Sequence, residues 1–510
     1  MTSASAAPPA RPAVRVVAAG LLAPLAAGAS CVLAFAPFYA WPVALVSFAI
    51  LFGTWAASGS PRQAWLSGYA FGLGEFLAGV SWVYVSLHDF GGMPAILTAI
   101  ATFLFAAYLA LFAAFAGWLA VRWGGDSRAR RLALAPPAYV AFEWLRGTLF
   151  TGFPWLNTGT SQAPSSPLAG FAPWLGTYGV SLAVCAAAAL LAALVISQAR
   201  ARVRFHLLLA LAALFAAGGL AGLPEWTTPA GAPVRVALLQ GNVAQEMKWR
   251  EEVRTRTLLE YQRMILAANA KVVVTPETAL PAFLDQLPGD YVESLLEDAH
   301  LHGKDILLGT VERIVHGHEY DYYNSLVRIT GGSTESYRKR HLVPFGEFIP
   351  PGFGWVLNIL HIPMSDFSRG TSTQPAIAAG GTRFGVAICY EDMYGEEVID
   401  SLPAAQVLVN VSNDAWFGHS LEPEQHLQAS QMRALETGRW MVRSTNTGVT
   451  AAIDEHGRVV SRLPEYTQGT LMADVVPRKG MTPYARTGNL PSLAIVGAML
   501  LVGRRRRARA

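Results

Sequence analysis

Charged residues are scarce in this sequence, and the few that occur are unevenly distributed. Asp, Glu, Lys and Arg make up 15% of the 510 residues and hydrophobic residues 52%, whereas roughly 25% of a typical soluble domain is charged. Of the 35 acids, only five precede residue 226, and the other thirty lie between Glu246 and Asp474. One ordinary soluble domain of this length is therefore excluded, and a membrane half followed by a water-compatible half is predicted.

Cysteine is scarce too, with only Cys31, Cys185 and Cys389 in the chain. A low, odd number is not the pattern of a disulfide framework. Cys31 and Cys185 lie in apolar runs, as small buried hydrophobic residues do. Cys389 is the one cysteine of the polar half, and this position makes it a candidate for chemistry.

Signatures of bound metals and cofactors are missing as well. The close histidine pairs, His300 with His302 and His316 with His318, have no suitable carboxylate or cysteine set beside them. No glycine-rich phosphate loop or dinucleotide fingerprint occurs. The net charge is only +4, and we expect no metal, no cofactor and no nucleic-acid partner.

Long apolar runs are what the first half has in abundance. A bilayer crossing takes about 20 apolar residues in a helix, and eight runs approach this length. They lie near residues 14–33, 40–57, 64–87, 94–121, 132–150, 173–196, 205–223 and 489–503. The sequence therefore predicts about seven spans in a membrane domain over residues 1–225 and one C-terminal span within residues 481–510.

The arginines predict how these runs are oriented. They gather before the first run and then in every second connection: Arg11, Arg15, Arg62, Arg122, Arg128, Arg130, Arg131, Arg200, Arg202, Arg204 and Arg504–Arg507. Basic residues mark the cytoplasmic side, so both termini and a basic tail should be cytoplasmic, with residues 226–480 outside. Further apolar runs follow the first directly, which favours a retained anchor over a cleaved signal peptide.

Two acids, Glu75 and Glu143, fall inside apolar runs, with Arg146 one helical turn after Glu143. Ionisable groups at membrane depth usually face a protein interior or a wet cavity. A contact with a lipid headgroup and a structural Glu143–Arg146 pair are both open interpretations.

The polar half alternates short β-rich runs with helical stretches. We expect strands at residues 234–240, 271–275, 305–311, 325–329, 384–388 and 405–411, with helices at 251–270 and 424–437. This alternation is typical of a layered α/β domain.

Three polar residues follow strand-like segments of this half. Glu277 follows Val-Val-Val-Thr-Pro, Lys339 follows Tyr-Arg, and Cys389 follows Gly-Val-Ala-Ile. Open α/β folds place their chemistry at strand ends. A thiol becomes a good nucleophile when a base or a cation favours its thiolate, and Glu277 and Lys339 could meet these two needs. Each signal alone is weak, because buried cysteines, turn carboxylates and surface lysines are common.

The order Glu, Lys, Cys resembles the carbon–nitrogen hydrolase (nitrilase) superfamily, and the chain as a whole is similar to its membrane-bound branch, the apolipoprotein N-acyltransferase family. Motifs in both halves carry the resemblance. They are Trp82–Ser86, Phe90–Pro94, Leu145–Gly147, Thr151–Trp155, Gln240–Asn242, Lys248–Trp249, Thr275–Glu277, Lys339–Glu347, Ile388–Glu391, Ser412–Gly418, Arg443–Asn446 and Thr482–Gly488.

This resemblance implies a polytopic α-helical membrane domain plus an αββα sandwich on the periplasmic side of the bacterial inner membrane. It implies that Cys389 takes an acyl chain from the sn-1 ester of a phospholipid such as phosphatidylethanolamine. The resulting thioester would then acylate the α-amine of diacylglyceryl-cysteine in an apolipoprotein, the last step of lipoprotein maturation. Glu277 would be the base and Lys339 the oxyanion partner of an enzyme in the lipid bilayer. Nothing in the sequence requires more than a monomer.

Further positions belong to the same family motifs. Glu347 is expected to orient Lys339 or the entering amine, Trp249 to contact lipid, and Glu391 to brace the Cys389 loop. A backbone N–H near Tyr390 is expected to help bind the oxyanion. Asn413 and Trp416 lie in a segment expected to form a gating loop. Local structural support is the alternative for each side chain.

Two other functions remain open from the residues alone. A membrane-tethered amidase or hydrolase would pass the same acyl-enzyme to water, because only the acceptor differs. A non-catalytic transporter or scaffold would not need Cys389 at all.

Overall fold

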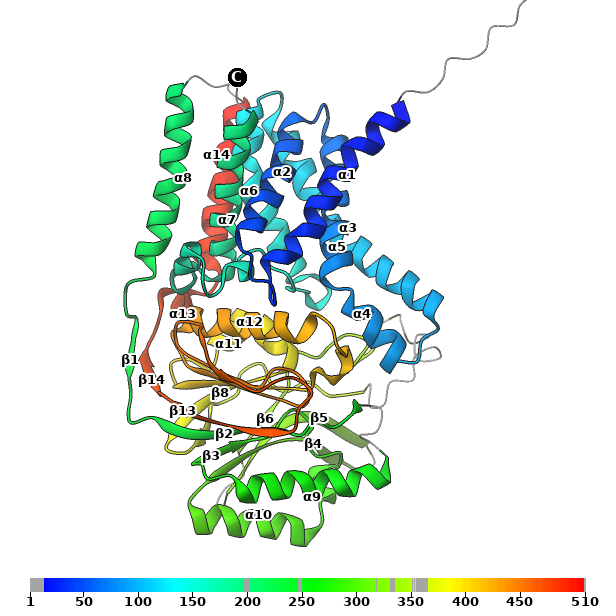
Figure 1. Cartoon of the computed structure of the whole chain (residues 1–510), viewed down its shortest axis with the longest axis vertical. Helices are drawn as coiled ribbons and strands as arrows, with labels where there is room; N and C mark the ends of the chain where they lie inside the picture. The colour runs from blue at the N-terminus through cyan, green and yellow to red at the C-terminus, as the bar shows by residue number, and fades with distance from the viewer. Residues whose placement is uncertain are drawn as a thin grey trace, which may run out of the picture.

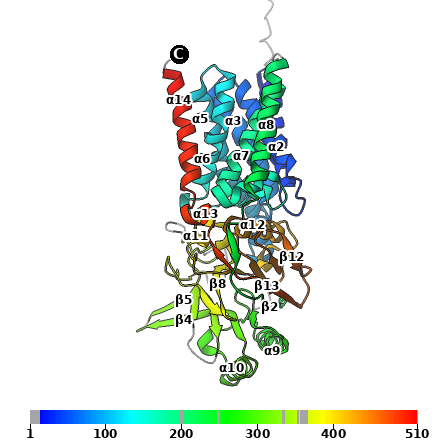
Figure 2. The same cartoon turned by 90° about the vertical axis from the view of Figure 1, so that its left-hand side faces the viewer.

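The computed structural model describes residues 13–196, 201–245, 250–317, 319–330, 335–350, 352, 354 and 366–508. A bundle of helices stands on a two-sheet sandwich, as Figure 1 and the turned view in Figure 2 show. α1 begins and α14 ends at the end of the bundle farthest from the sandwich (Figure 1).

Each of the eight predicted apolar runs falls on a helix of the bundle. The helices are α1 (Ala13–Cys31), α2 (Pro42–Ala57), α3 (Pro61–Gly79), α4 (Trp82–Val85), α5 (Ala95–Gly124), α6 (Arg128–Arg146), α7 (Ala172–Ile196), α8 (Ala201–Ala221) and α14 (Leu490–Ala508). The third run is broken, because α3 ends at Gly79 and the chain bends by 52° into Trp82–Phe90.

Fewer than eight of these helices are long and apolar enough to cross a bilayer by themselves. In the described residues three qualify: α5, the helical segment Pro167–Ile196, and α8, with a fourth if the bent pair counts as one span. The apolar parts of α1, α2 and α14 are shorter, and α6 carries Arg130, Arg131, Glu143 and Arg146. Length and composition thus establish a membrane domain with three or four candidate spans.

Two six-stranded sheets build the sandwich. The first has the order β13-β2-β3-β4-β5-β6 and the second β12-β11-β10-β9-β8-β7. Their bounds are β2 (Val234–Gln240), β3 (Val272–Val274), β4 (Asp305–His316), β5 (Glu319–Ile329), β6 (Glu335–Arg338), β7 (Ile377–Ala379), β8 (Thr382–Ile388), β9 (Val407–Ser412), β10 (Met441–Thr445), β11 (Ala451–Ile453), β12 (Val459–Arg462) and β13 (Gly469–Val475). A separate pair, β1 (Thr227–Pro229) with β14 (Arg478–Gly480), runs beside them.

Parallel strands form the centre of each sheet: β2, β3 and β4 in the first, β8, β9 and β10 in the second. Strands buried on both faces have continuous apolar sequences, as Val-Val-Val in β3 shows. One apolar core lies between the sheets and joins Val274 and Leu307 of the first to Val386 and Val409 of the second.

Helices cover the outer face of each sheet. α9 (Glu251–Ala267) and α10 (Gly289–His302) pack on the first sheet, through residues such as Ile265 and Leu295. α11 (Gly395–Ile399) and α12 (Glu422–Thr437) pack on the second, through Val398 and Leu427. The α/β sandwich expected from the resemblance is thereby confirmed.

Helix α12 lies between the sandwich and the bundle (Figure 1). Its Gln425 Oε1 accepts hydrogen bonds from the indole nitrogens of Trp82 at 3.3 Å and Trp155 at 2.7 Å. One turn later, Gln428 accepts from the N–H of Ala36 at 2.9 Å. The second sheet is therefore fixed to the bundle, whereas α9 and α10 lie at the distal end.

Candidate active site

The three residues singled out by the sequence follow strands from both sheets. Glu277 lies three residues after β3, Lys339 directly follows β6, and Cys389 directly follows β8. Lys339 Nζ lies 3.2 Å from Glu277 Oε1, and the charges of both residues act on the Cys389 thiol. The fold thus brings together side chains separated by up to 112 positions (389 − 277).

Glu277 and Lys339 belong to a closed group of four side chains, of which Glu277, Lys339 and Asn324 are buried and Glu347 is partly buried. Lys339 Nζ donates to Glu277 Oε1 at 3.2 Å and to Glu347 Oε1 at 2.9 Å. Asn324, on β5, donates its Nδ2 to the same two oxygens, at 2.6 and 3.0 Å. Glu347 therefore lies where the sequence placed it, beside Lys339, and Asn324 is a partner that the sequence did not reveal.

Both carboxylates are also held by backbone N–H groups. Glu277 Oε2 accepts from the N–H of Asn413 at 2.9 Å, and Glu347 Oε2 from the N–H of Val343 at 2.9 Å. Asn413 is fixed in turn, because its Nδ2 donates to Gln245 at 2.7 Å. Glu277 is therefore oriented before any substrate arrives.

The Cys389 backbone makes a sharp turn at the end of β8. Its φ of +53° lies in the left-handed region, which is rare for a residue with a side chain and marks functional sites. The chain then enters the short 3₁₀ helix η9 (Cys389–Met393). N–H groups in the first turn of a helix have no intrahelical partner, so the Tyr390 N–H is a suitable donor for an oxyanion.

Burial and the neighbouring charges together determine the charge states of the nucleophile and the cation. Burial raises the pKa of the Cys389 thiol well above its ordinary value, Glu277 raises it further, and Lys339 only partly opposes this. Burial alone would lower the pKa of Lys339, but Glu277 and Glu347 hold it well above its ordinary value. The resting site thus holds a protonated thiol beside an ammonium group, and the thiol needs a base to react.

Glu391 joins the loop of Lys339 to the loop of Cys389. Its Oε1 accepts from the N–H groups of Arg340 at 2.7 Å and His341 at 3.1 Å. Its Oε2 accepts from the N–H of Ile388 at 2.7 Å and the hydroxyl of Tyr337 at 3.1 Å. Burial raises the pKa of Glu391 to about 7, although these backbone N–H groups lower it.

The remaining predicted residues lie elsewhere. The Tyr390 ring faces the bundle, where it stacks on Trp155 at 6.3 Å and donates to the carbonyl of Gly152 at 3.2 Å. Trp416 lies on η10 (Asp414–Phe417) with its ring 6.4 Å from that of Phe90, in the α4 region of the bundle. Trp249 lies outside the described residues.

A buried cluster of charged residues that the sequence did not reveal lies behind Cys389. Within the described ranges, one trio offers ligand atoms close enough for a metal, namely Asp414, Glu422 and His426, with all atoms within 4.8 Å. Arg443 NH2 lies 2.9 Å from Asp414 Oδ2 and 2.8 Å from His426 Nδ1. The guanidinium already supplies the positive charge there, so the cluster is an ion-pair network and a poor place for a metal.

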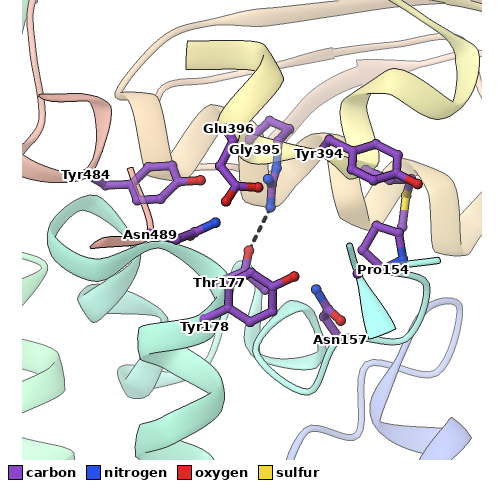
Figure 3. Close-up of a pocket in the computed structure, with 12 residues that line it drawn as sticks. Pro154, Asn157, Thr177, Tyr178, Tyr394, Gly395, Glu396, Tyr484 and Asn489 are labelled. Carbon is purple, nitrogen blue, oxygen red and sulfur yellow. Dashed lines mark hydrogen bonds between the residues drawn. The ribbon is translucent and has the colours of Figure 1, made fainter. Parts of the chain in front are cut away.

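A small polar cavity lies at the junction of bundle and sandwich. Figure 3 shows Thr177 and Tyr178 of the bundle facing Tyr394 and Glu396 of the sandwich across it. None of Glu277, Lys339 and Cys389 lines this cavity. It belongs to the contact between the two parts, where Arg433 NH2 donates to Thr177 Oγ1 at 2.7 Å.

Comparisons with known proteins match both parts of the chain. Residues 27–190 match the model of the apolipoprotein N-acyltransferase N-terminal domain, and residues 235–484 match that of carbon-nitrogen hydrolase.

Curated relatives match over nearly the whole length. An apolipoprotein N-acyltransferase of Nitrosomonas europaea is 48% identical, over 95% of this chain and 96% of its own. One of Methylococcus capsulatus is 45% identical over 96% of each chain. One of Ralstonia nicotianae is 43% identical, over 96% of this chain and 94% of its own.

Proposed function

The chain belongs to the apolipoprotein N-acyltransferase family, and from this we propose that it moves a fatty acyl chain from a phospholipid to the N-terminal α-amine of diacylglyceryl-cysteine in apolipoproteins. The observation that carries the proposal is the buried Glu277–Lys339 pair acting on Cys389 at the end of β8. This arrangement suits an acyl-enzyme mechanism in which a base, an oxyanion partner and a nucleophile have separate roles.

In the first half-reaction Cys389 attacks the sn-1 ester carbonyl of the phospholipid. Glu277 takes the thiol proton as the new S–C bond forms. The ester C–O bond then breaks, and the leaving oxygen takes the proton back from Glu277. The products are a thioester on Cys389 and a lysophospholipid, and Glu277 is again a carboxylate.

The tetrahedral intermediate carries a negative oxygen that must be stabilised. The Lys339 ammonium and the N–H of Tyr390 are the donors we assign to it. Lys339 is suited because its two carboxylate partners keep it charged in a buried place, and preorganised donors in a dry site are the most effective. Glu347 accepts from this cation and Asn324 donates to both carboxylates, so the cation and the base are held in one hydrogen-bonded group.

In the second half-reaction the lipoprotein amine attacks the thioester. Glu277 accepts a proton from the attacking nitrogen, the C–S bond breaks, and the proton passes to the Cys389 thiolate. The amide product leaves, and the thiol is restored. Exclusion of water protects the thioester between the two steps, and a site next to the bilayer serves because both substrates carry acyl chains.

The proposed setting is the bacterial inner membrane, with residues 226–480 in the periplasm and both termini in the cytoplasm. Eight spans give this arrangement if the shorter helices α1, α2, α6 and α14 also cross. In support, α1 begins and α14 ends at the same end of the bundle (Figure 1). Phosphatidylethanolamine is the donor and a monomer the working unit in this proposal.

A two-substrate assay separates this proposal from hydrolysis. The purified full chain is incubated in detergent with phosphatidylethanolamine and a diacylated lipopeptide, and the products are measured by mass spectrometry. Triacylated peptide and lysophospholipid in equal amounts are expected. Free fatty acid without triacylated peptide would establish a hydrolase and refute the transferase.

A further inference from the structure

The backbone carbonyl of Cys389 is held by two side chains from neighbouring elements. Asn410 Nδ2, on β9, lies 3.0 Å from this oxygen, and His426 Nε2, on α12, lies 3.1 Å from it. Up to Ile388 the strand pairs with β9 through the backbone. At Cys389 the chain turns away from β9, so its carbonyl oxygen is bonded by side chains and not by the backbone of β9.

The contacts of His426 establish that its Nε2 carries a hydrogen. Nε2 lies 3.1 Å from the Cys389 carbonyl and 2.8 Å from Asp392 Oδ1. A carbonyl and an ionised carboxylate only accept, so Nε2 carries the hydrogen. Nδ1 lies 2.8 Å from Arg443 NH2 and 3.4 Å from the carboxylate oxygens of Asp414 and Glu422. Burial and Arg443 lower the pKa of His426, but Asp392 and Asp414 hold it well above its ordinary value, so Nε2 keeps its hydrogen whether or not Nδ1 is protonated.

The partners of His426 are themselves fixed and buried. His426, Asp392 and Arg443 are each 1% exposed or less. Asp392 accepts a second bond from Ser430 Oγ at 2.5 Å, and Arg443 NH1 donates to Asn410 Oδ1 at 2.9 Å. Both donors to the Cys389 carbonyl are thus joined through Arg443. A ring held at both nitrogens has little freedom to turn.

We propose that His426 is a positioning residue that sets the direction of the Cys389 thiol. Its Nε2–H holds the carbonyl of a residue in an unfavourable backbone conformation, and this directs Sγ toward Glu277 and Lys339. The inference rests on the proposed role of Cys389 as nucleophile. His426 touches no substrate in this role and acts through the backbone of Cys389.

The position of His426 also ties the nucleophile to the bundle. His426 follows Gln425, which accepts from Trp82 and Trp155, and its own ring lies 5.7 Å from that of Trp155. One helix therefore contacts the bundle with one residue and the nucleophile loop with the next. The thiol is thereby held at a fixed place relative to the bundle.

The test uses three variants of the full-length protein in detergent. His426→Leu removes the N–H while keeping an apolar side chain in the space. His426→Gln restores an N–H donor of similar reach. Arg439→Met is the matched control, because Arg439 is fully buried and donates to the carbonyls of Ala405 and Gly480 without contacting the Cys389 loop.

Single-turnover acylation by phosphatidylethanolamine is followed by intact mass, which gives a rate and a final amplitude. We expect His426→Leu to acylate about 100-fold more slowly, since a misplacement of about 1 Å costs this much, with the amplitude unchanged. His426→Gln should lie within about tenfold of the wild type. Arg439→Met should acylate at the wild-type rate even where its thermal midpoint falls.

Each other outcome has a defined meaning. A wild-type rate in His426→Leu overturns the positioning role while the acyl-enzyme stands. A reduced amplitude at an unchanged rate, or the same slowing in Arg439→Met, shows loss of folded protein and also overturns it. No acyl-enzyme in the wild type refutes the proposed function itself.

Discussion

The two sheets of the sandwich contribute to the candidate site in different ways. The first sheet supplies Glu277 and Lys339, held by charged side chains at 2.9–3.2 Å. The second supplies Cys389, held by hydrogen bonds to its backbone. In the proposed mechanism the first sheet therefore supplies the groups for proton transfer and oxyanion binding, whereas the second sheet fixes the position of the nucleophile.

The two sheets also differ in how they meet the bundle. The second sheet is joined to it through α12, and the apolar core of the bundle continues into Tyr390, Met393 and Met432 of the sandwich. The first sheet carries α9 and α10 at the distal end (Figure 1). The second sheet, which carries Cys389, is therefore the part whose position relative to the bundle is fixed.

The largest effect is expected from the nucleophile. Cys389→Ala should abolish acyl-enzyme formation and transfer, because no other described cysteine lies near the site: Cys31 and Cys185 are buried in the bundle. Intact mass after exposure to phospholipid and the lipopeptide assay both measure this. Cys185→Ala is the control and should acylate normally. Transfer by Cys389→Ala would show that Cys389 is not the nucleophile, and the contrast drawn between the two sheets would then be wrong.

The first sheet should give the next largest effect. Glu277→Gln keeps the shape but cannot take the thiol proton, so the acylation rate should fall by about 10²–10⁴-fold. Since burial holds the Cys389 pKa well above its ordinary value, the remaining rate should rise with pH as the thiol ionises. Rapid-mixing acylation from pH 7 to 10 measures both effects.

Glu312→Gln is the control for this substitution. Glu312 is a carboxylate of β4 paired with Arg338 at 3.0 Å and has no contact with the site residues named above. Its variant should acylate at the wild-type rate. A Glu277→Gln rate equal to wild type would mean that another group removes the proton.

Glu391 joins the loops of Lys339 and Cys389, and its loss should slow acylation by about 10–100-fold, because misplaced reacting groups cost this much. The pKa of Glu391 is about 7, so its carboxyl group is protonated below pH 7. The protonated oxygen then accepts hydrogen bonds from the backbone N–H groups less well than a carboxylate oxygen does. Acylation by the wild type should therefore slow as the pH falls from 8 to 6. Glu391→Gln should be slow at both values, and equal pH profiles in the two proteins would contradict this.

Folding raises this pKa from 4.5 to about 7, so the folded state binds the proton more tightly. The contribution of Glu391 to the free energy of unfolding should therefore be greatest below pH 4.5 and decline as the pH rises to 7. The difference in thermal midpoint between the wild type and Glu391→Gln, followed over this range, measures the decline.

The smallest effect concerns the junction with the bundle. Gln425→Leu leaves the indole N–H groups of Trp82 and Trp155 without their acceptor, which should lower stability by about 1–3 kcal/mol. The thermal midpoint in detergent should fall, with a slower acylation because α12 also carries His426. Leu259→Gln on α9, a 58% exposed position, should change neither. Equal effects of both variants would contradict the idea that only the second sheet is fixed to the bundle.

The sequence predicts well where a local pattern marks the position. Strand-like segments followed by a charge or a thiol located Glu277, Lys339 and Cys389, and the family motifs brought in Glu347 and Glu391. The layered sandwich followed from the alternation of strands and helices together with the resemblance. Each of these features depends on neighbours in the chain.

The rest depends on contacts across the fold. Asn410 could have been suspected, since it is a polar residue inside the apolar strand β9, whereas Asn324 lies in a strand of mixed composition. Nothing local names the partners of either residue. His426 lies on an ordinary helical pattern, and its link to Cys389 crosses 37 positions. The sequence did not reveal the break after Gly79, because the composition stays apolar through it. By length and composition, at most four segments of the described residues qualify as membrane spans, whereas the sequence predicted eight.

The intact mass of the wild-type protein tests the central claim most directly. After incubation with a phosphatidylethanolamine of defined sn-1 chain, we predict a mass increase equal to that one acyl group, located on Cys389 by peptide mapping. Adding diacylated lipopeptide should return the protein to its original mass and add the same chain to the peptide. A protein that never gains the acyl mass, or gains it on another residue, would contradict the account.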